Sequence, residues 1–216
     1  DTSPSCPIRV VGTGASRQAT DTTSLHFRAG CRCMSCENQQ RRSRPPFPYP
    51  GPVAKTPRAA TPAIAALVAA GMEHRVLEYH HDPRSHDFGA EAVAALTGGE
   101  LVAEQIFKTL VLALPKGLAV AVLPVPAKLS LKAAAAALGV AKATMADPAD
   151  AQRSSGYVLG GISPLGQRRR LPTVLDSSAL GFDEVLFSAG KRGMSLAVAP
   201  GDLVALTSAV VVDICA

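Results

Sequence analysis

The sequence has little cysteine beyond its first 55 residues and no long apolar run. Cys215 is the only one of the five cysteines that lies after residue 55. A domain with one cysteine has no disulfide framework, which favours a reducing compartment, and we expect the cytoplasm. No run of about 18 apolar residues occurs, so no membrane span is expected. The N-terminus also lacks the apolar core of a secretory leader, so no signal peptide is expected.

The net charge of +5 comes entirely from the first part of the chain. Residues 1–55 hold eight Lys/Arg and three Asp/Glu, whereas residues 56–216 hold fourteen of each. The overall positive charge therefore gives no reason to expect a basic nucleic-acid face on the rest of the chain. Any basic patch there must be local, and the run Arg168–Arg170 is the candidate.

Residues 1–56 are expected to form a disordered extension, and residues 57–216 to form one domain. Seven of the seventeen prolines lie in the first 55 residues, together with many Ser, Thr and Arg, and no periodic apolar pattern is present there. Such a segment buries too little surface to offset the entropy of ordering it. The extension is therefore not expected to contribute to the fold.

The extension also contains a cluster of thiols, which raises the alternative of a zinc site. Cys31, Cys33 and Cys36 are closely spaced, and His26 or Cys6 could supply another ligand. Structural zinc usually takes four ligands arranged as two spaced pairs, and this cluster has no clear second pair. We therefore expect no metal there.

From Thr61 onwards the chain alternates between short helical and extended patterns. Cap residues, prolines and helix formers predict helices that start at Pro62, Gly89, Leu131, Pro148 and about Pro200. Extended apolar patterns predict strands over residues 74–80, 107–114, 118–125, 173–175, 184–187, 194–199 and 210–214. Hairpins mixed with helices, without regular βαβ alternation, indicate an α+β domain around a mainly antiparallel sheet.

Two glycine-containing loops and one lysine suggest a pocket lined by backbone donors. Gly160 and Gly161 lie between an apolar run and a Ser-Pro turn, and the second loop is SAGKRG, residues 188–193. Such glycines let the backbone approach a ligand closely or adopt a positive φ. The second loop could equally be an ordinary hairpin turn with solvated charges. Lys108 could face solvent on an edge strand, or enter a pocket and steady an oxyanion.

The segment HHDPRSHD contains several potential metal ligands, namely His80, His81, Asp82, His86 and Asp87. Adjacent histidines on an extended chain point to opposite sides, and the spacing is not that of a helical zinc motif. We therefore interpret them as solvated loop histidines.

Nucleophilic catalysis by the protein is not indicated. No Ser/His/Asp triad can be assigned from sequence order, because triads are recognised by geometry. Cys215 lies far along the chain from both glycine loops, and we interpret it as a small buried hydrophobic residue.

Four segments together resemble a known family. They are TPAIAALVAAGMEHRVLEYHHDPRSHDFGAEAVAAL, FKTLVLAL, MADPADAQRSSGYVLGGISPLGQRRRLPTVLD and SAGKRG. They are similar to the YbaK/EbsC family, free-standing relatives of the bacterial prolyl-tRNA synthetase editing domain, from about Thr61 to Ile214. The resemblance implies a trans-editing deacylase that clears Cys-tRNA(Pro), on a barrel-like sheet flanked by helices.

The resemblance also assigns roles to individual residues. Lys108 matches the family's essential lysine. The substrate-binding positions it implies are Tyr79, Phe88, Thr109, Gly160, Gly161, Ile162, Ser163, Ser188 and Gly190. The tRNA contacts expected are Arg168, Arg169, Arg170, Lys191 and Arg192, and neither a metal nor another cofactor is expected. Two positions depart from the family: Ala189 replaces a usual glycine, and Ser195 stands where some members carry an acidic residue.

The mechanism proposed for the family is substrate-assisted. The cysteinyl thiol attacks its own ester carbonyl and leaves as a cyclic thiolactone, so the enzyme needs oriented donors rather than a nucleophile. The expected partners are mischarged tRNA(Pro) and prolyl-tRNA synthetase, with no membrane. Two alternatives stay open: water-dependent editing of another small amino acid such as alanine, and a module that binds aminoacyl-tRNA or a nucleotide without turnover.

Overall fold

The computed structural model describes residues 61–99 and 101–216. The predicted extension, residues 1–56, and its thiol cluster lie outside the described residues. Within the described ranges, no helix has both the length and the apolar character needed to cross a bilayer.

Five α-helices are present among the described residues, and most begin at a side-chain cap that the sequence predicted. They are α2 (Pro62–Ala69), α3 (Phe88–Leu96), α4 (Leu131–Ala137), α5 (Pro148–Ser155) and α6 (Pro200–Thr207). Thr61, Ser130 and Asp147 each accept a hydrogen bond from a backbone N–H in the first turn of α2, α4 and α5. Helix α3 starts one residue earlier than predicted because Asp87 accepts from the Ala90 N–H at 3.0 Å and acts as its cap.

The strands form two sheets. Strands β1 (Arg75–Glu78), β7 (Met194–Val198) and β6 (Val185–Lys191) make an antiparallel sheet in that order. The second sheet has the order β4 (Thr144–Met145), β2 (Phe107–Ala113), β3 (Leu118–Pro124), β5 (Thr173–Asp176) and β8 (Val210–Val212). Strands β2 and β3 form the predicted hairpin, whereas β5 pairs in parallel with both β3 and β8. Two short 3₁₀ turns, η1 (Ala103–Gln105) and η2 (Ser177–Gly181), connect the elements.

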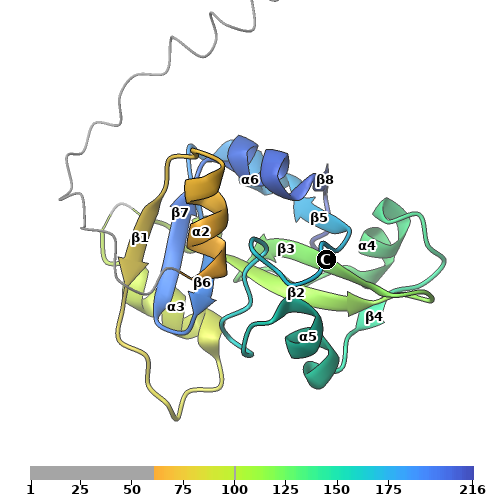
Figure 1. The fold of residues 1–216 in the computed structure, drawn as a ribbon, viewed down its shortest axis with the longest axis horizontal. Coiled ribbons are helices and arrows are strands. Elements are labelled where there is room, and N and C mark those ends of the chain that lie inside the picture. Colours follow the sequence, from red (N-terminus) through yellow and green to blue (C-terminus); the bar gives the residue numbers. More distant parts are fainter. Residues whose placement is uncertain (1–60, 100) are drawn as a thin grey trace, which may run out of the picture. The chain divides into compact units, whose positions relative to one another are not determined.

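The α+β class and the predominance of antiparallel pairing are confirmed, but the barrel-like sheet is a wrong prediction. The two sheets meet where β6 lies beside β2, and one isolated bridge between Ile106 and Leu186 joins them (Figure 1). A continuous ladder is needed to close a barrel. Because pairing stops after this bridge, the strands remain two sheets.

The β2–β3 hairpin separates two apolar clusters, since successive side chains of a strand point to opposite faces. Phe107, Val111 and Val122 pack into the larger cluster with residues of α2, β6, β7 and the segment 157–165. Leu112 and Leu123 pack on the other face with α4. Lys108 pairs in register with Leu123 and therefore lies on this second face of the hairpin.

Candidate active site

The first glycine loop follows α5 and is closed by its own hydrogen bonds. The hydroxyl of Tyr157 donates to the Leu165 carbonyl at 2.8 Å, and Gln167 Nε2 donates to the Ser163 carbonyl at 2.8 Å. The Ser163 hydroxyl, which is fully buried, accepts from the Leu165 N–H at 3.3 Å. Burial raises the pKa of Tyr157 to about 12, so this phenol remains a hydrogen-bond donor at neutral pH. These hydrogen bonds therefore fix the conformation of the loop backbone.

The second glycine loop, residues 188–193, comprises the end of β6 and the turn into β7, and it contains a break in the β-ladder. The register shifts between Ser188 and Lys191, which is a bulge, and the Ser188 hydroxyl accepts from the Gly190 N–H at 3.3 Å. Thr61, the cap of α2, donates its hydroxyl hydrogen to the Ala189 carbonyl. Gly190 has φ +94°, a conformation that L residues rarely adopt. The turn therefore differs from the ordinary hairpin turn that the sequence also allowed, because it contains a β-bulge and a glycine with positive φ.

The two loops are in direct contact. A Cβ atom at Gly161 would lie 3.3 Å from Lys191 Cα, and one at Gly190 would lie 2.6 Å from the Tyr157 ring. Arg192 Nε also donates to the Leu159 carbonyl at 2.8 Å. The sequence-based hypothesis of one site required these turns to be neighbours, and the structure places them together.

Phe88, the first residue of α3, covers the first loop. A Cβ at Gly160 would lie 2.3 Å from the Phe88 ring, so only glycine lets the ring pack this closely. The Arg192 guanidinium lies over the same ring, 4.6 Å from its centroid. His81 contributes a tilted ring 5.8 Å from that of Phe88. Phe88 is therefore the side chain around which three separate chain segments meet.

The segment between β1 and α3 is held by a contact between His81 and Glu91 that the sequence analysis did not foresee. His81 Nδ1 lies 2.7 Å from Glu91 Oε2, and the other Glu91 oxygen accepts from the Asp82 N–H at 2.6 Å. The hydrogen bond from His81 is the main cause that lowers the pKa of Glu91. His81 is half-buried, unlike the exposed His80 and His86, so the interpretation of all three as solvated residues is wrong for His81.

Tyr79 lies beside the second loop at the end of β1. Its N–H donates to the Gly193 carbonyl at 2.9 Å, and a Cβ at Gly193 would lie 2.7 Å from the Tyr79 carbonyl oxygen. Burial raises the pKa of Tyr79 above its usual value, so the phenol stays protonated at neutral pH. Of the aromatic residues expected at the site, both Tyr79 and Phe88 contact a glycine loop.

Lys108 lies near the first turn of α3. Its Nζ donates to the carbonyls of Val125 at 3.0 Å and Ala127 at 2.6 Å, and it is half-buried. Burial lowers its pKa, and electrostatic interactions with Cys215 and Asp87 oppose this shift. It has no hydrogen bond to either glycine loop within the described residues. It is linked to them through Val125, which contacts Gly89 in the same helical turn as Phe88.

The remaining predicted pocket residues lie around the larger apolar cluster. Thr109 points to the face opposite Lys108, and its Oγ1 is buried without a hydrogen-bond partner in the described structure. Ile162 is 8% exposed and packs in that cluster. The hydroxyl groups of Ser163 and Ser188 each accept a hydrogen bond from a backbone N–H of their own loop. Contact with a ligand at these positions remains a prediction and would come mainly from the main chain.

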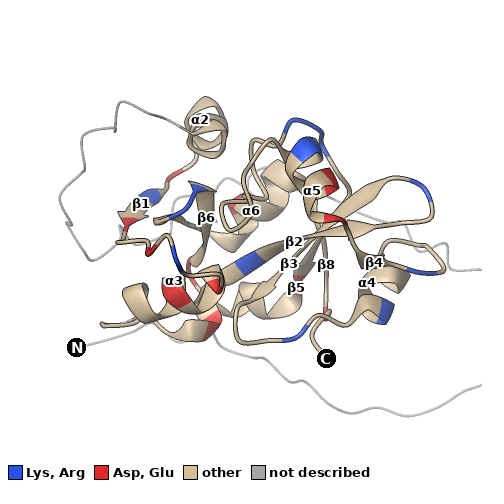
Figure 2. Ribbon diagram, turned by 90° about the horizontal axis from the view of Figure 1, so that it is seen from below, with Lys and Arg blue, Asp and Glu red and all other residues tan. Residues whose placement is uncertain are grey.

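The three arginines, Arg168 to Arg170, do not form a single basic patch. Arg168 and Arg169 contact the C-terminal end of α5, whereas Arg170 contacts the end of α6. The N–H groups of Arg168 and Arg169 donate to the carbonyls of Ser155 and Ser154, and the stem of Arg168 covers Gly156. Arg170 donates to the Leu206 carbonyl and, at 2.7 Å, to Ser208 Oγ at the end of α6, which is a helix-capping role. Figure 2 shows the basic residues spread over several helices, strands and loops, so contacts with phosphate would be local.

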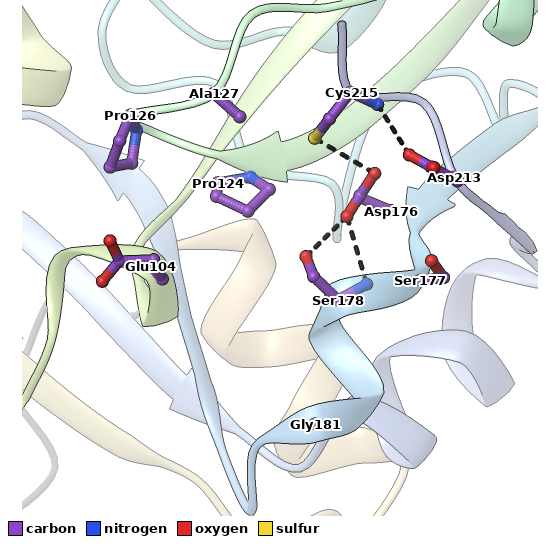
Figure 3. A pocket seen from close by; sticks show the side chains of 10 residues that line it. All are labelled: Glu104, Pro124, Pro126, Ala127, Asp176, Ser177, Ser178, Gly181, Asp213 and Cys215. Carbon is purple, nitrogen blue, oxygen red and sulfur yellow. Dashed lines mark hydrogen bonds between the residues drawn. The ribbon is translucent and has the colours of Figure 1, made fainter.

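A separate hollow of about 630 Å³ surrounds the end of β5 and the last residues of the chain. Figure 3 shows Asp176 at its centre, where Ser178, Ile214 and Cys215 donate to the carboxylate. The ligand atoms of Asp176, Asp213 and Cys215 lie within 4.8 Å of one another, a spacing that could hold a metal ion. These donors already occupy the Asp176 oxygens, so the carboxylate is explained as an anchor for the end of the chain.

Cys215 differs from its predicted role. It is half-buried and donates its S–H to Asp176 Oδ2 at 3.2 Å, so it is not a purely apolar core residue. Burial raises the pKa of its thiol to about 11, and Asp176 adds to this effect. A thiol that stays protonated is a poor nucleophile. This environment makes Cys215 a poor candidate for a catalytic nucleophile.

Replacing Asp176 with asparagine should lower the free energy of unfolding at pH 7 by about 1–3 kcal/mol, because buried donors lose their charged acceptor. Burial alone would raise the pKa of Asp176, but hydrogen bonds from Ser178, Ile214 and Cys215 outweigh it and the net pKa is lowered. A lowered folded-state pKa stabilises the fold above the unfolded pKa of about 3.9, and this contribution is lost as pH falls through the folded value.

Urea unfolding of the native protein and Asp176→Asn at pH 7 and near pH 2 measures this difference. The gap between the two proteins should narrow at the acidic pH. Asp213→Asn is the matched control, since among the described residues this exposed carboxylate accepts only from the Cys215 N–H. Equal stability of the native and Asp176→Asn proteins at pH 7 would show that the carboxylate does not anchor the chain end.

Comparison with known proteins identifies related domains. Residues 86–206 match the model of the aminoacyl-tRNA editing domain. A curated relative from Enterococcus faecalis, named as the Cys-tRNA(Pro)/Cys-tRNA(Cys) deacylase EbsC, is 38% identical over 143 residues, which are 62% of this chain and 86% of the relative.

Two solved structures share the fold over 72% of this chain. One, described as a trans-editing enzyme for prolyl-tRNA synthetase, is 29% identical with a TM-score of 0.61 and is covered over 95% of its length. The other, the hypothetical protein APE2540, is 25% identical with a TM-score of 0.64 and is covered over its full length.

Proposed function

Since the chain belongs to the family of aminoacyl-tRNA editing domains, we propose that it is a trans-editing deacylase that clears cysteine from mischarged tRNA(Pro). The similarity to EbsC and to the trans-editing structure supports this substrate class. Residues 57–216 would form the catalytic domain, and the reaction belongs to the cytoplasm, where protein synthesis consumes aminoacyl-tRNA.

The observation that carries the proposal is the contact between the two glycine loops beneath Phe88 and Arg192. Both loops present main chain, and the serines in them are engaged by backbone N–H groups rather than by a histidine. Oriented backbone donors without an activated nucleophile suit a reaction in which the substrate supplies the nucleophile. This is the arrangement that substrate-assisted release of cysteine requires.

In this mechanism the sulfur of the bound cysteine forms a bond to its own ester carbonyl carbon. The carbon–oxygen bond to the ribose breaks, the thiol proton passes to the leaving ribose oxygen, and cysteine departs as a thiolactone. Lys108 would steady the developing oxyanion. Its side chain lies on the hairpin face opposite the cluster that contains the glycine loops, so the ester carbonyl would have to reach the edge of the hairpin beside Asp87 and Phe88. An ammonium group has three N–H donors, and the carbonyls of Val125 and Ala127 take two of them, which leaves one for the substrate.

Binding of the tRNA itself would rest on phosphate contacts, which position a nucleic acid without reading its sequence. Arg168, Arg169 and Lys191 are exposed and lie close to the loops, which supports this role. The near-neutral charge of residues 56–216 suits modest affinity, and prolyl-tRNA synthetase would present the substrate. Arg170 is a weaker candidate because it caps α6.

A panel of tRNA(Pro) charged with cysteine, serine, alanine or proline tests the proposal. Cysteine should be released with turnover at enzyme well below substrate, and the released product should be trapped as a thiolactone. Serine is the matched control because only the sulfur is replaced. Equal rates for alanine and cysteine would favour attack by water, and release of no more than one equivalent would favour a binding module.

A further inference from the structure

We propose that Arg192 is a positioning residue for the first glycine loop rather than a contact to tRNA phosphate. The kinetic effects expected of Arg192 variants rest on the proposed deacylase function. The contacts that Arg192 makes do not depend on it. It changes the role expected from the sequence, in which Arg192 and its neighbour Lys191 were two equivalent cations on one turn.

Arg192 contacts both the first glycine loop and the ring that covers it. Its Nε donates to the carbonyl of Leu159, the residue directly before Gly160, at 2.8 Å. Its guanidinium lies 4.6 Å from the centroid of the Phe88 ring, and that ring packs against Gly160. One side chain of the second loop therefore holds both the main chain of the first loop and the aromatic ring that covers it.

The neighbouring cation, Lys191, has a different environment. Lys191 is exposed, and its ammonium has no hydrogen bond or ion pair among the residues that the structure describes. Arg192 is half-buried. The Nε edge of its guanidinium donates a hydrogen bond to Leu159, and its face stacks on Phe88. A side chain that binds a flexible phosphate does not need to be fixed by neighbouring protein groups. A side chain that holds two loops together does.

The two contacts of Arg192 need a planar cationic group. A guanidinium can donate from its Nε edge while its face stacks on an aromatic ring. A lysine ammonium is a compact point charge and cannot make both contacts in this geometry. Arg192→Lys therefore removes the positioning contacts while it keeps the positive charge that a phosphate would require.

Steady-state deacylation of Cys-tRNA(Pro) by the full chain tests the proposal. Arg192→Lys should lower kcat by about 10- to 100-fold, since a small displacement of oriented groups has effects of this size. Its KM and the dependence of KM on salt should stay close to those of the native protein. Lys191→Ala, the neighbouring phosphate contact, should raise KM and reduce the salt slope by about 1. Lys116→Ala, in the distant β2–β3 turn, controls for the loss of one positive charge.

A second measurement does not depend on activity. Hydrogen exchange of residues 157–163 should become faster in Arg192→Lys than in the native protein. If that variant does not fold, Phe88→Leu, which removes the stacked ring and keeps the Arg192–Leu159 hydrogen bond, should show the same faster exchange.

The kinetic and hydrogen-exchange results distinguish a failure of the positioning role of Arg192 from a failure of the proposed deacylase function. A native protein that does not turn over Cys-tRNA(Pro) would refute the proposed function, and hydrogen exchange would still decide the role of Arg192. Native kcat in Arg192→Lys, with a raised KM and a reduced salt slope in Arg192→Ala, would overturn the positioning role. Unchanged exchange in residues 157–163 would overturn it as well.

Discussion

Replacing Lys108 with alanine should lower kcat/KM for Cys-tRNA(Pro) by about 10²- to 10³-fold, the usual cost of removing one donor to a developing oxyanion. The lysine is half-buried on a strand and fixed by the carbonyls of Val125 and Ala127, so its third N–H has a defined direction. Its lowered pKa reflects burial, which also strengthens its interaction with a developing negative charge. Deacylation assays under single-turnover conditions measure the loss.

The fold should survive this change. The two carbonyls lose their donor, but both residues are half-buried and water can replace it, so we expect a cost of about 1 kcal/mol. Lys108→Met keeps most of the apolar stem and separates the loss of donors from the loss of packing. Retained turnover in both variants would remove Lys108 from the mechanism and leave only the carbonyl contacts as its role.

Local sequence signals predicted the elements of the fold well. Thr61, Ser130 and Asp147 cap helices in the structure because a cap depends on residues only two or three positions away. The β2–β3 hairpin was predictable for the same reason, since its turn is short. The split into two sheets and the parallel pairing of β5 with β3 and β8 depend on distant segments, and no local pattern encodes them.

The sequence singled out both glycine loops, and the structure brings them together, but the contacts around them were not predictable. The glycines of both loops were recognised from their spacing and from the family resemblance. The pairing of Arg192 with Phe88 and of His81 with Glu91 joins segments that no motif connects. Asp176 was missed, although an aspartate that ends a strand before two serines is a recognisable signal for a cap.

Gly160→Ala should abolish measurable deacylation, with a loss of about 100-fold or more, and should destabilise the fold by about 3 kcal/mol. Gly160 has φ +78°, and the added Cβ would lie 2.3 Å from the Phe88 ring. Either the ring or the loop must move, and each movement displaces the backbone donors from the ester. Thermal unfolding and deacylation of the same preparation measure the two effects.

The result can be assigned to this contact because the chain contains a matched glycine. Gly117 has φ +84°, and a Cβ there would meet no atom within 4 Å. Gly117→Ala should therefore cost only the left-handed strain, about 1 kcal/mol, and leave deacylation unchanged. Adding Phe88→Ala to Gly160→Ala should recover part of the stability, since the clash partner is gone. If Gly160→Ala behaves like Gly117→Ala in both assays, the close packing of Phe88 on the loop is not what shapes the site, and the backbone-donor mechanism loses its structural basis.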